Sequence, residues 1–214
     1  MAPRQKQTTA DDIRDRNTTR DVLFFEVRIE GRNALLMHNA QLSDPLNPYA
    51  QALKAVSGKK RKTDADHEEM ARIEMEGGLW LNADKRVCVP GNAIDGVMRG
   101  GASVYRLGKK FTAAVYAPEE SYELEYDGPK DIAALVADRR FRDRRCVSVQ
   151  MAKIWRTRPK FDKWALNFTL LMLNDAGVTI DNVRQALEDG GRRVGLGDYR
   201  PKFGHFDLVK FDEA

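Results

Sequence analysis

The chain has 214 residues, of which 42% are hydrophobic and 32% are charged, and its formal net charge is +4 at pH 7. This length suits one domain with an insertion or two small domains, and the mild excess of Lys and Arg is consistent with a polyanionic partner, although net charge alone favours a well-solvated surface. Two cysteines without a CxxC pair exclude a zinc ribbon, and the absence of a long apolar run excludes a membrane span, so we expect a cytoplasmic protein without metal, cofactor or membrane partner.

An alternating pattern marks the first core element. From Leu23 to Ile29 apolar and polar residues alternate, which predicts a half-buried strand after a polar arm over residues 1–21. A turn is expected between Pro159 and Asp162. The other predicted elements are, in chain order, a short helix over 49–56, a helix over 65–76 capped by Thr63 or Asp64, a strand at 87–89, a helix from Asn92 to Leu107, strands over 146–157 and 163–173, a helix from Thr179 or Asp181 to Asp189 and a strand over 203–211.

The order strand, helix, strand, strand, helix, strand predicts an α+β fold. We expect the ferredoxin-like (RRM-like) βαββαβ arrangement, an antiparallel sheet with helices on one face. Residues 22–214 then form a single domain with insertions at about 39–86, which is helical and thumb-like, and at about 111–145. The open face of such a sheet is a common platform for RNA, although many unrelated functions use the fold.

A glycine-rich segment, Gly-Leu-Gly-Asp-Tyr-Arg-Pro-Lys-Phe-Gly, runs between the last predicted helix and the last strand. Gly195, Gly197 and Gly204 permit positive φ angles, and successive amides can form an anion nest. Arg200 and Lys202 add positive charge beside it. We therefore predict a phosphate cradle in which Gly197→Val weakens binding and leaves the fold largely intact; the plainer alternative is a flexible connection.

Basic residues concentrate in two further runs, Lys59–Lys62 and Arg139–Arg145, and Trp155 is interleaved among the cations that follow the second run. Arginines with interleaved aromatics suit a phosphate chain with unstacked bases, although a solvated surface is the alternative. The nucleic-acid contacts predicted from these runs are Lys59, Lys60, Arg61, Lys62, Arg139, Arg140, Arg142, Arg144, Arg145, Arg156 and Arg158.

A proline-glycine turn at Pro90 precedes a predicted helix whose free amides and dipole favour an anion. The sequence Val-Pro-Gly-Asn-Ala-Ile-Asp-Gly-Val-Met-Arg ends at Arg99 and contains Asn92, and both residues are predicted contacts. Together with the glycine-rich segment, this motif resembles the RAMP superfamily, whose members carry a similar turn before the first core helix and a glycine-rich loop before the last strand. The resemblance spans about 22–211, and Asp95 departs from it where the family often has Lys.

The resemblance implies a subunit like the backbone subunits of CRISPR effector complexes, which act in antiviral defence. Such a protein assembles head to tail with copies of itself, and with other effector subunits, along single-stranded guide or target RNA. The first strand, which ends at His38-Asn39, is similar to the family's first strand, so Asn39 joins the predicted contacts.

Two alternatives to a binding subunit stay open. One is a RAMP-type endoribonuclease, in which Asp44 lies in the loop where cleaving members place a required Asp and His38 is a general base. Each residue also has a structural interpretation, because Asp before Pro is common in turns and a His at a strand end is usually structural. The other alternative is a stand-alone relative on a mobile element that binds single-stranded nucleic acid or a host complex. The residues favour a non-enzyme and leave the question open.

Overall fold

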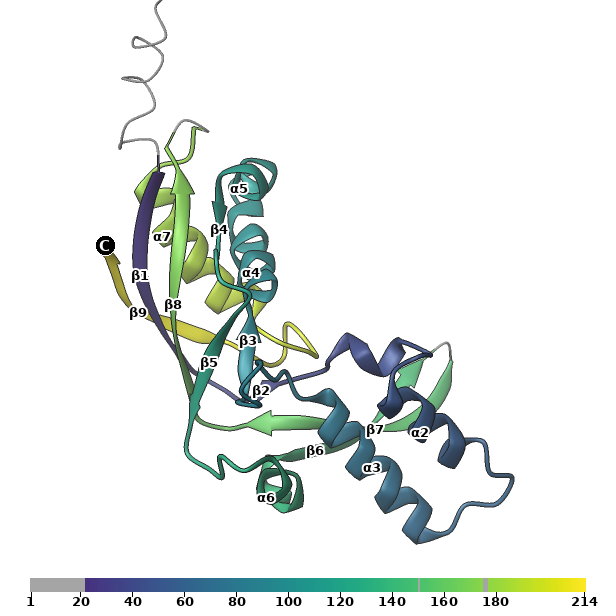
Figure 1. The fold of residues 1–214 in the computed structure, drawn as a ribbon. Coiled ribbons are helices and arrows are strands. Elements are labelled where there is room, and N and C mark those ends of the chain that lie inside the picture. Colours follow the sequence, from purple (N-terminus) through teal and green to yellow (C-terminus); the bar gives the residue numbers. More distant parts are fainter. Residues whose placement is uncertain (1–21, 150, 175–176) are drawn as a thin grey trace, which may run out of the picture.

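The computed structural model describes residues 22–149, 151–174 and 177–214, so the predicted arm over 1–21 lies outside the described residues. The fold is α+β with antiparallel sheets, as predicted (Figure 1). The α-helices are α2 (Pro48–Ser57), α3 (Asp64–Gly78), α4 (Gly91–Ser103), α5 (Gly108–Ala114), α6 (Ile132–Ala137) and α7 (Ile180–Asp189). Short 3-10 helices, η1 (Ala40–Ser43) and η2 (Arg139–Phe141), and a π-helical segment, η3 (Gly190–Val194), complete them. The strands are β1 (Val22–Gly31), β2 (Leu35–Leu36), β3 (Cys88–Pro90), β4 (Val115–Tyr116), β5 (Ser121–Tyr126), β6 (Arg142–Val149), β7 (Ala152–Phe161), β8 (Trp164–Leu173) and β9 (Phe206–Glu213).

The main sheet has the strand order β3-β5-β8-β1-β9, with β4 also paired to β8, and every pairing is antiparallel. Apolar residues at every second position place one face of β1 and β8 in the core, where Val27 lies opposite Phe168. Helices α4 and α7 cover this face and pack closely, since a Cβ at Gly101 would lie 2.0 Å from the carbonyl oxygen of Ala186 (Figure 1). The core therefore lies between the sheet and these helices.

Strands β6 and β7 form a hairpin that projects away from the main sheet and pairs with β2 (Figure 1). Helix α3 packs along β7, and its buried Glu74 reaches the backbone of that strand. Glu74 Oε2 accepts the N–H of Thr157 at 2.8 Å, and Oε1 accepts Nη1 of Arg156 at 2.8 Å. A carboxylate rather than another strand thus satisfies the backbone N–H of Thr157.

The hairpin corrects two sequence-based predictions. The strand predicted over 146–157 is wrong, because the chain turns between β6 and β7 with Met151 at φ 67°. The turn predicted at Pro159 is also misplaced, since Pro159 lies inside β7, where its carbonyl accepts the N–H of Met37 at 3.0 Å. The strand that accompanies β8 in the main sheet is instead β5.

Helix α4 also differs from its prediction. It ends at Ser103 rather than Leu107, and α5 follows after Arg106 takes a positive φ of 62°. Helix α4 begins at Gly91 rather than Asn92, and its N-cap residue is Pro90, which makes no capping bond with its side chain. Val104, which directly follows the helix, is 48% exposed.

Candidate nucleic-acid interface

The glycine-rich loop is packed tightly against the chain around β2. Four of its amides donate hydrogen bonds of 2.7–2.9 Å to backbone carbonyls; these are the amides of Gly195, Leu196, Asp198 and Gly204. They are therefore not free to form the predicted anion nest. A Cβ at Gly197, whose φ is 81°, would lie 2.3 Å from the carbonyl oxygen of Leu36. A valine at position 197 thus cannot leave the fold intact, which corrects the expectation from sequence. The side chains of Arg200 and Lys202 are exposed.

The loop and the hairpin meet through aromatic and cationic side chains. The guanidinium carbon of Arg145 lies 5.1 Å from the ring centroid of Tyr199 and 4.7 Å from that of Phe203. Arg158 lies 5.5 Å from the Tyr199 ring, and its Nε is 2.5 Å from Oδ2 of Asp198. All three separations between a guanidinium carbon and a ring centroid fall within the range of favourable cation–π contact. Two motifs that are distant in sequence therefore form one continuous surface.

The hairpin has two sides because side chains alternate along its strands. Arg145, Arg156 and Arg158 project to the side that meets the glycine-rich loop, which we call the loop-facing side. Cys146 and Trp155 are cross-strand neighbours on the opposite, outer side. Arg144, Ser148, Lys153 and Thr157 share this outer side. The arginine run of the sequence is thus divided between two surfaces.

Carboxylates pair with Arg140 in η2 and with the arginines of β6 and β7. The pairs are Arg140 with Asp138, Arg142 and Arg144 with Glu68, Arg145 with Asp143, Arg156 with Glu74, and Arg158 with Asp198. The side chain of Arg156 remains 38% exposed, whereas that of Arg158 is 12% exposed. Nη1 of Arg158 is inaccessible to solvent and has no hydrogen-bond partner among the described residues. The arginines are therefore oriented by their partners, and their net positive charge is smaller than the sequence suggests.

His38 lies beside the loop-facing side. A cleft of about 240 Å³ is lined by His38, Leu42, Ser43, Leu53, Val147, Arg156 and Arg158. Burial lowers the pKa of His38; Asp198 opposes this shift and Arg158 adds to it, so the imidazole is neutral at pH 7 and can accept a proton. Asp44 does not line this cleft, and its carboxylate accepts the N–H of Leu46 at 2.9 Å within a turn. The two catalytic candidates therefore do not share a site.

Asn39 and the start of α4 are occupied by internal hydrogen bonds. Asn39 caps η1 by accepting the N–H of Gln41 at 3.1 Å. At α4, the N–H of Gly91 donates to the carbonyl of Glu120 at 2.9 Å, so this amide is not free for a phosphate. Asp95, which departs from the RAMP pattern, accepts the N–H of Ala117 at 2.8 Å. Asn92 and Arg99 are exposed on α4, apart from the hairpin (Figure 1).

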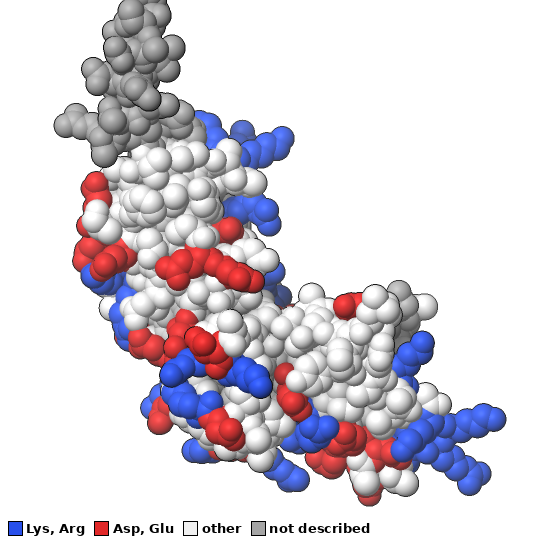
Figure 2. All heavy atoms as spheres, in the orientation of Figure 1, with Lys and Arg blue, Asp and Glu red and all other residues white. Residues whose placement is uncertain are grey.

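The Lys59–Lys62 run lies in the loop between α2 and α3, at the end of the molecule farthest from the main sheet (Figure 1). Figure 2 shows basic side chains projecting from this end. Lys59 Nζ pairs with Asp66 at 2.5 Å, and Lys60 and Arg61 are exposed. The structure thus does not bring this run together with the glycine-rich loop.

The open face of the main sheet is predominantly acidic. Its charged residues are Glu26, Arg28, Glu30, Glu123, Glu125, Asp207, Lys210 and Asp212. Arg28 makes two bonds of 3.0 Å to Glu125, and Lys210 Nζ lies 2.7 Å from Glu26. Figure 2 shows acidic side chains over the strands of the main sheet. Because carboxylates outnumber cations here, this face repels a polyanion and is a poor RNA platform.

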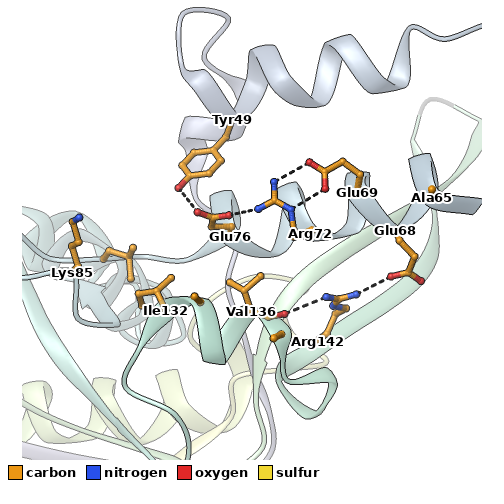
Figure 3. A pocket seen from close by; sticks show the side chains of 13 residues that line it. Tyr49, Ala65, Glu68, Glu69, Arg72, Glu76, Lys85, Ile132, Val136 and Arg142 are labelled. Carbon is orange, nitrogen blue, oxygen red and sulfur yellow. Dashed lines mark hydrogen bonds and ion pairs between the residues drawn. The ribbon is translucent and has the colours of Figure 1, made fainter.

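A larger groove of about 880 Å³ lies between α3 and α6 (Figure 3). Arg72 donates to Glu69 and Glu76 at 2.8 Å, and the Tyr49 hydroxyl also donates to Glu76. Arg142 bonds to Glu68 and to the Val136 carbonyl. Both arginines of the groove are thus engaged by neighbouring oxygens and are poorly placed to bind a phosphate.

None of the helices in the described ranges has the length and apolar composition that crossing a bilayer requires. Within 22–149, 151–174 and 177–214, no three His, Cys, Asp or Glu side chains are grouped so that they could hold a metal ion. No protein-family model and no curated protein sequence matches the chain.

Proposed function

We propose that this chain is an RNA-binding subunit of the RAMP type, which assembles head to tail with its own copies along single-stranded RNA. The observation that carries the proposal is the joint between the hairpin and the glycine-rich loop. Arg145 and Arg158 pack over Tyr199 there, while Arg200 and Lys202 remain exposed beside them. Cations oriented by neighbouring carboxylates and next to aromatic rings suit a phosphate chain with unpaired bases.

The strand order supports a ferredoxin-like βαββαβ core. Helix α4 lies between β1 and β5 in the chain, and α7 lies between β8 and β9. In the sheet, β8 separates β1 from β5, and β1 separates β8 from β9. Two split βαβ units with their helices on one face give this arrangement. The self-assembly in the proposal comes from the RAMP resemblance.

Binding of an unstructured single-stranded RNA, followed by fluorescence anisotropy at rising salt, tests the proposal. We expect tighter binding than to a duplex of the same sequence, and a logarithmic salt slope of about −0.7 for each phosphate neutralised. Sedimentation with RNA should show assemblies larger than the monomer. A protein that stays monomeric and binds no RNA at low salt would contradict the proposal, and sequencing of co-purified nucleic acid would identify the natural ligand.

A second candidate function is RNA cleavage, and the cleft at His38 favours it. A neutral imidazole beside Arg156 and Arg158 combines a proton acceptor with positive charge that can stabilise a phosphorane. Incubation of labelled RNA with the wild type, His38→Ala and Asp44→Ala separates the candidates. Cleavage that is lost only with His38→Ala would support it, and no cleavage with or without divalent metal would exclude it.

A further inference from the structure

Trp155 is unusually exposed for its type. Its residue surface is 63% exposed, whereas Trp164 is 4% exposed and donates its indole N–H to the Asn33 carbonyl at 2.9 Å. A tryptophan buries a large apolar area when it packs, so an indole left in water forgoes a sizeable hydrophobic stabilisation. Because tryptophan is enriched at binding interfaces, the exposed Trp155 is a candidate contact for a partner.

The surroundings of Trp155 are cationic and polar. The guanidinium carbon of Arg144 lies 5.8 Å from the Trp155 ring centroid, and Lys153 shares the outer side. Asp143, the single carboxylate in the hairpin sequence, projects to the loop-facing side and bonds to Arg145. The carboxylate of Glu68 does reach Arg144, at 3.7 Å. The outer side therefore combines an accessible ring face with positive charge.

We propose that Trp155 stacks on an unpaired base of single-stranded RNA while Arg144 and Lys153 contact the adjoining phosphates. The inference rests on the proposed function and adds a base-contacting position on the outer side of the hairpin. RNA is favoured over a protein partner because Lys153 accompanies this ring, and lysine is depleted at protein interfaces although tryptophan and arginine are common there. Because every base has a stacking face, this contact selects unpaired bases without strong sequence preference.

The test compares binding of an unstructured RNA with binding of inorganic polyphosphate, which has the phosphates and lacks the bases. Trp155→Ala should weaken RNA binding by roughly five- to 100-fold and change polyphosphate binding little. Trp155→Phe should restore most of the RNA affinity. Tyr116→Ala removes another exposed aromatic, 40% exposed on β4, and should leave both affinities unchanged.

The reactivity of the Cys146 thiol provides an independent test of RNA binding at Trp155 in the wild-type protein. This cysteine is exposed and directly opposite Trp155, whereas Cys88 is 2% exposed. RNA bound over Trp155 should slow the reaction of the Cys146 thiol with a disulfide reagent, and polyphosphate should slow it less. The unfolding midpoint of Trp155→Ala should match that of the wild type, because the indole makes few buried contacts.

Three outcomes would overturn the inference while leaving RNA binding intact. They are an unchanged RNA affinity of Trp155→Ala, an equal loss for RNA and polyphosphate, and a loss of self-association by RNA-free Trp155→Ala, which would assign the ring to a protein interface. Absence of RNA binding by the wild type would instead overturn the proposed function and this inference with it.

Discussion

The open face of the main sheet and the β6–β7 hairpin are both exposed antiparallel surfaces, but they carry opposite charge. On the sheet, Arg28 is bound by Glu125 among other carboxylates. On the hairpin, arginines outnumber carboxylates and Trp155 is exposed. Two surfaces with the same backbone geometry thus differ in electrostatics. The sheet face repels a polyanion, and the hairpin attracts one. The side chains, and not the strand arrangement, therefore give the two surfaces their opposite charge.

The glycine-rich loop, which packs on the chain around β2 and meets the hairpin, is where we expect the largest effect. Gly197→Val places a branched side chain at positive φ and against the Leu36 carbonyl, so the free energy of unfolding should fall by about 3–5 kcal/mol. Gly96→Ala is the control, because a Cβ at Gly96 meets nothing within 4 Å and alanine favours the helix by about 0.5–1 kcal/mol. Urea unfolding measures the stability of both variants. A Gly197→Val protein as stable as the wild type would contradict the close packing of the loop against the Leu36 carbonyl.

Paired carboxylates in the two regions should differ in importance. Glu74→Ala leaves the Thr157 amide without its buried acceptor and should cost about 2–4 kcal/mol of unfolding free energy. Glu125→Ala removes an exposed ion pair from the sheet and should cost about 0.2–1 kcal/mol. Glu74→Gln, which keeps an oxygen acceptor, should lie between them. Equal losses in urea unfolding for the two alanine variants would remove this distinction between hairpin and sheet.

Charge reversal sharpens the comparison in RNA binding. The double variant Arg200→Glu, Lys202→Glu should weaken single-stranded RNA binding about tenfold or more. The slope of log affinity against log salt should become shallower by the amount expected for the loss of about two phosphate contacts. Arg28→Glu with Lys210→Glu applies the same change of charge to the sheet and should leave RNA affinity nearly unchanged. Anisotropy titrations measure all three proteins. A larger loss from the sheet pair would show that RNA lies on the sheet after all.

Acid should lower the free energy of unfolding by a smaller amount, through Asp189 at the end of α7 and His38 in the cleft beside the hairpin. Hydrogen bonding by Tyr105 and by Arg193 lowers the pKa of Asp189 to about 2, so the stability it contributes is present at neutral pH and is lost as the pH falls from about 4 toward 2. Burial lowers the pKa of His38, so stability also falls as the pH drops below its unfolded value of about 6.5. The urea unfolding midpoint, measured across this pH range, checks both assignments. Asp189→Asn should reduce the fall in the midpoint between about pH 4 and pH 2, and His38→Gln should reduce the fall that begins below about pH 6.5. An unaltered pH profile in both variants would contradict these assignments.

Sequence patterns predicted the elements that short-range signals control. The alternating apolar residues of β8 are all buried, as expected for one face of a strand. Thr63 caps α3 as predicted, because a hydroxyl three residues before Asp66 can accept its amide hydrogen. The end of α7 before Gly190 was also predicted correctly. Each of these signals acts within a few residues and needs no knowledge of the tertiary structure.

The hairpin and the pairing of its charges could not be predicted in this way. The link between Val149 and Ala152 contains no Gly, Pro or Asn, so nothing in the sequence marks a turn there. Glu74, which binds Arg156, lies on a helix far back in the chain. An arginine-rich run shows where charge is available but not which carboxylates will neutralise it. The one exposed tryptophan had a sequence signal, its place among the cations, but its exposure appears only in the structure.

Only Asp162 and Lys163 separate β7 from β8, so the hairpin is joined almost directly to a central strand of the main sheet. A force on the hairpin is therefore transmitted to the main sheet through this two-residue link. Force applied at the outer end is transmitted to a strand with neighbours on both sides, which resists extraction because its hydrogen bonds must break together. A hairpin joined in this way can bear a load at its outer end without unravelling the main sheet from that point.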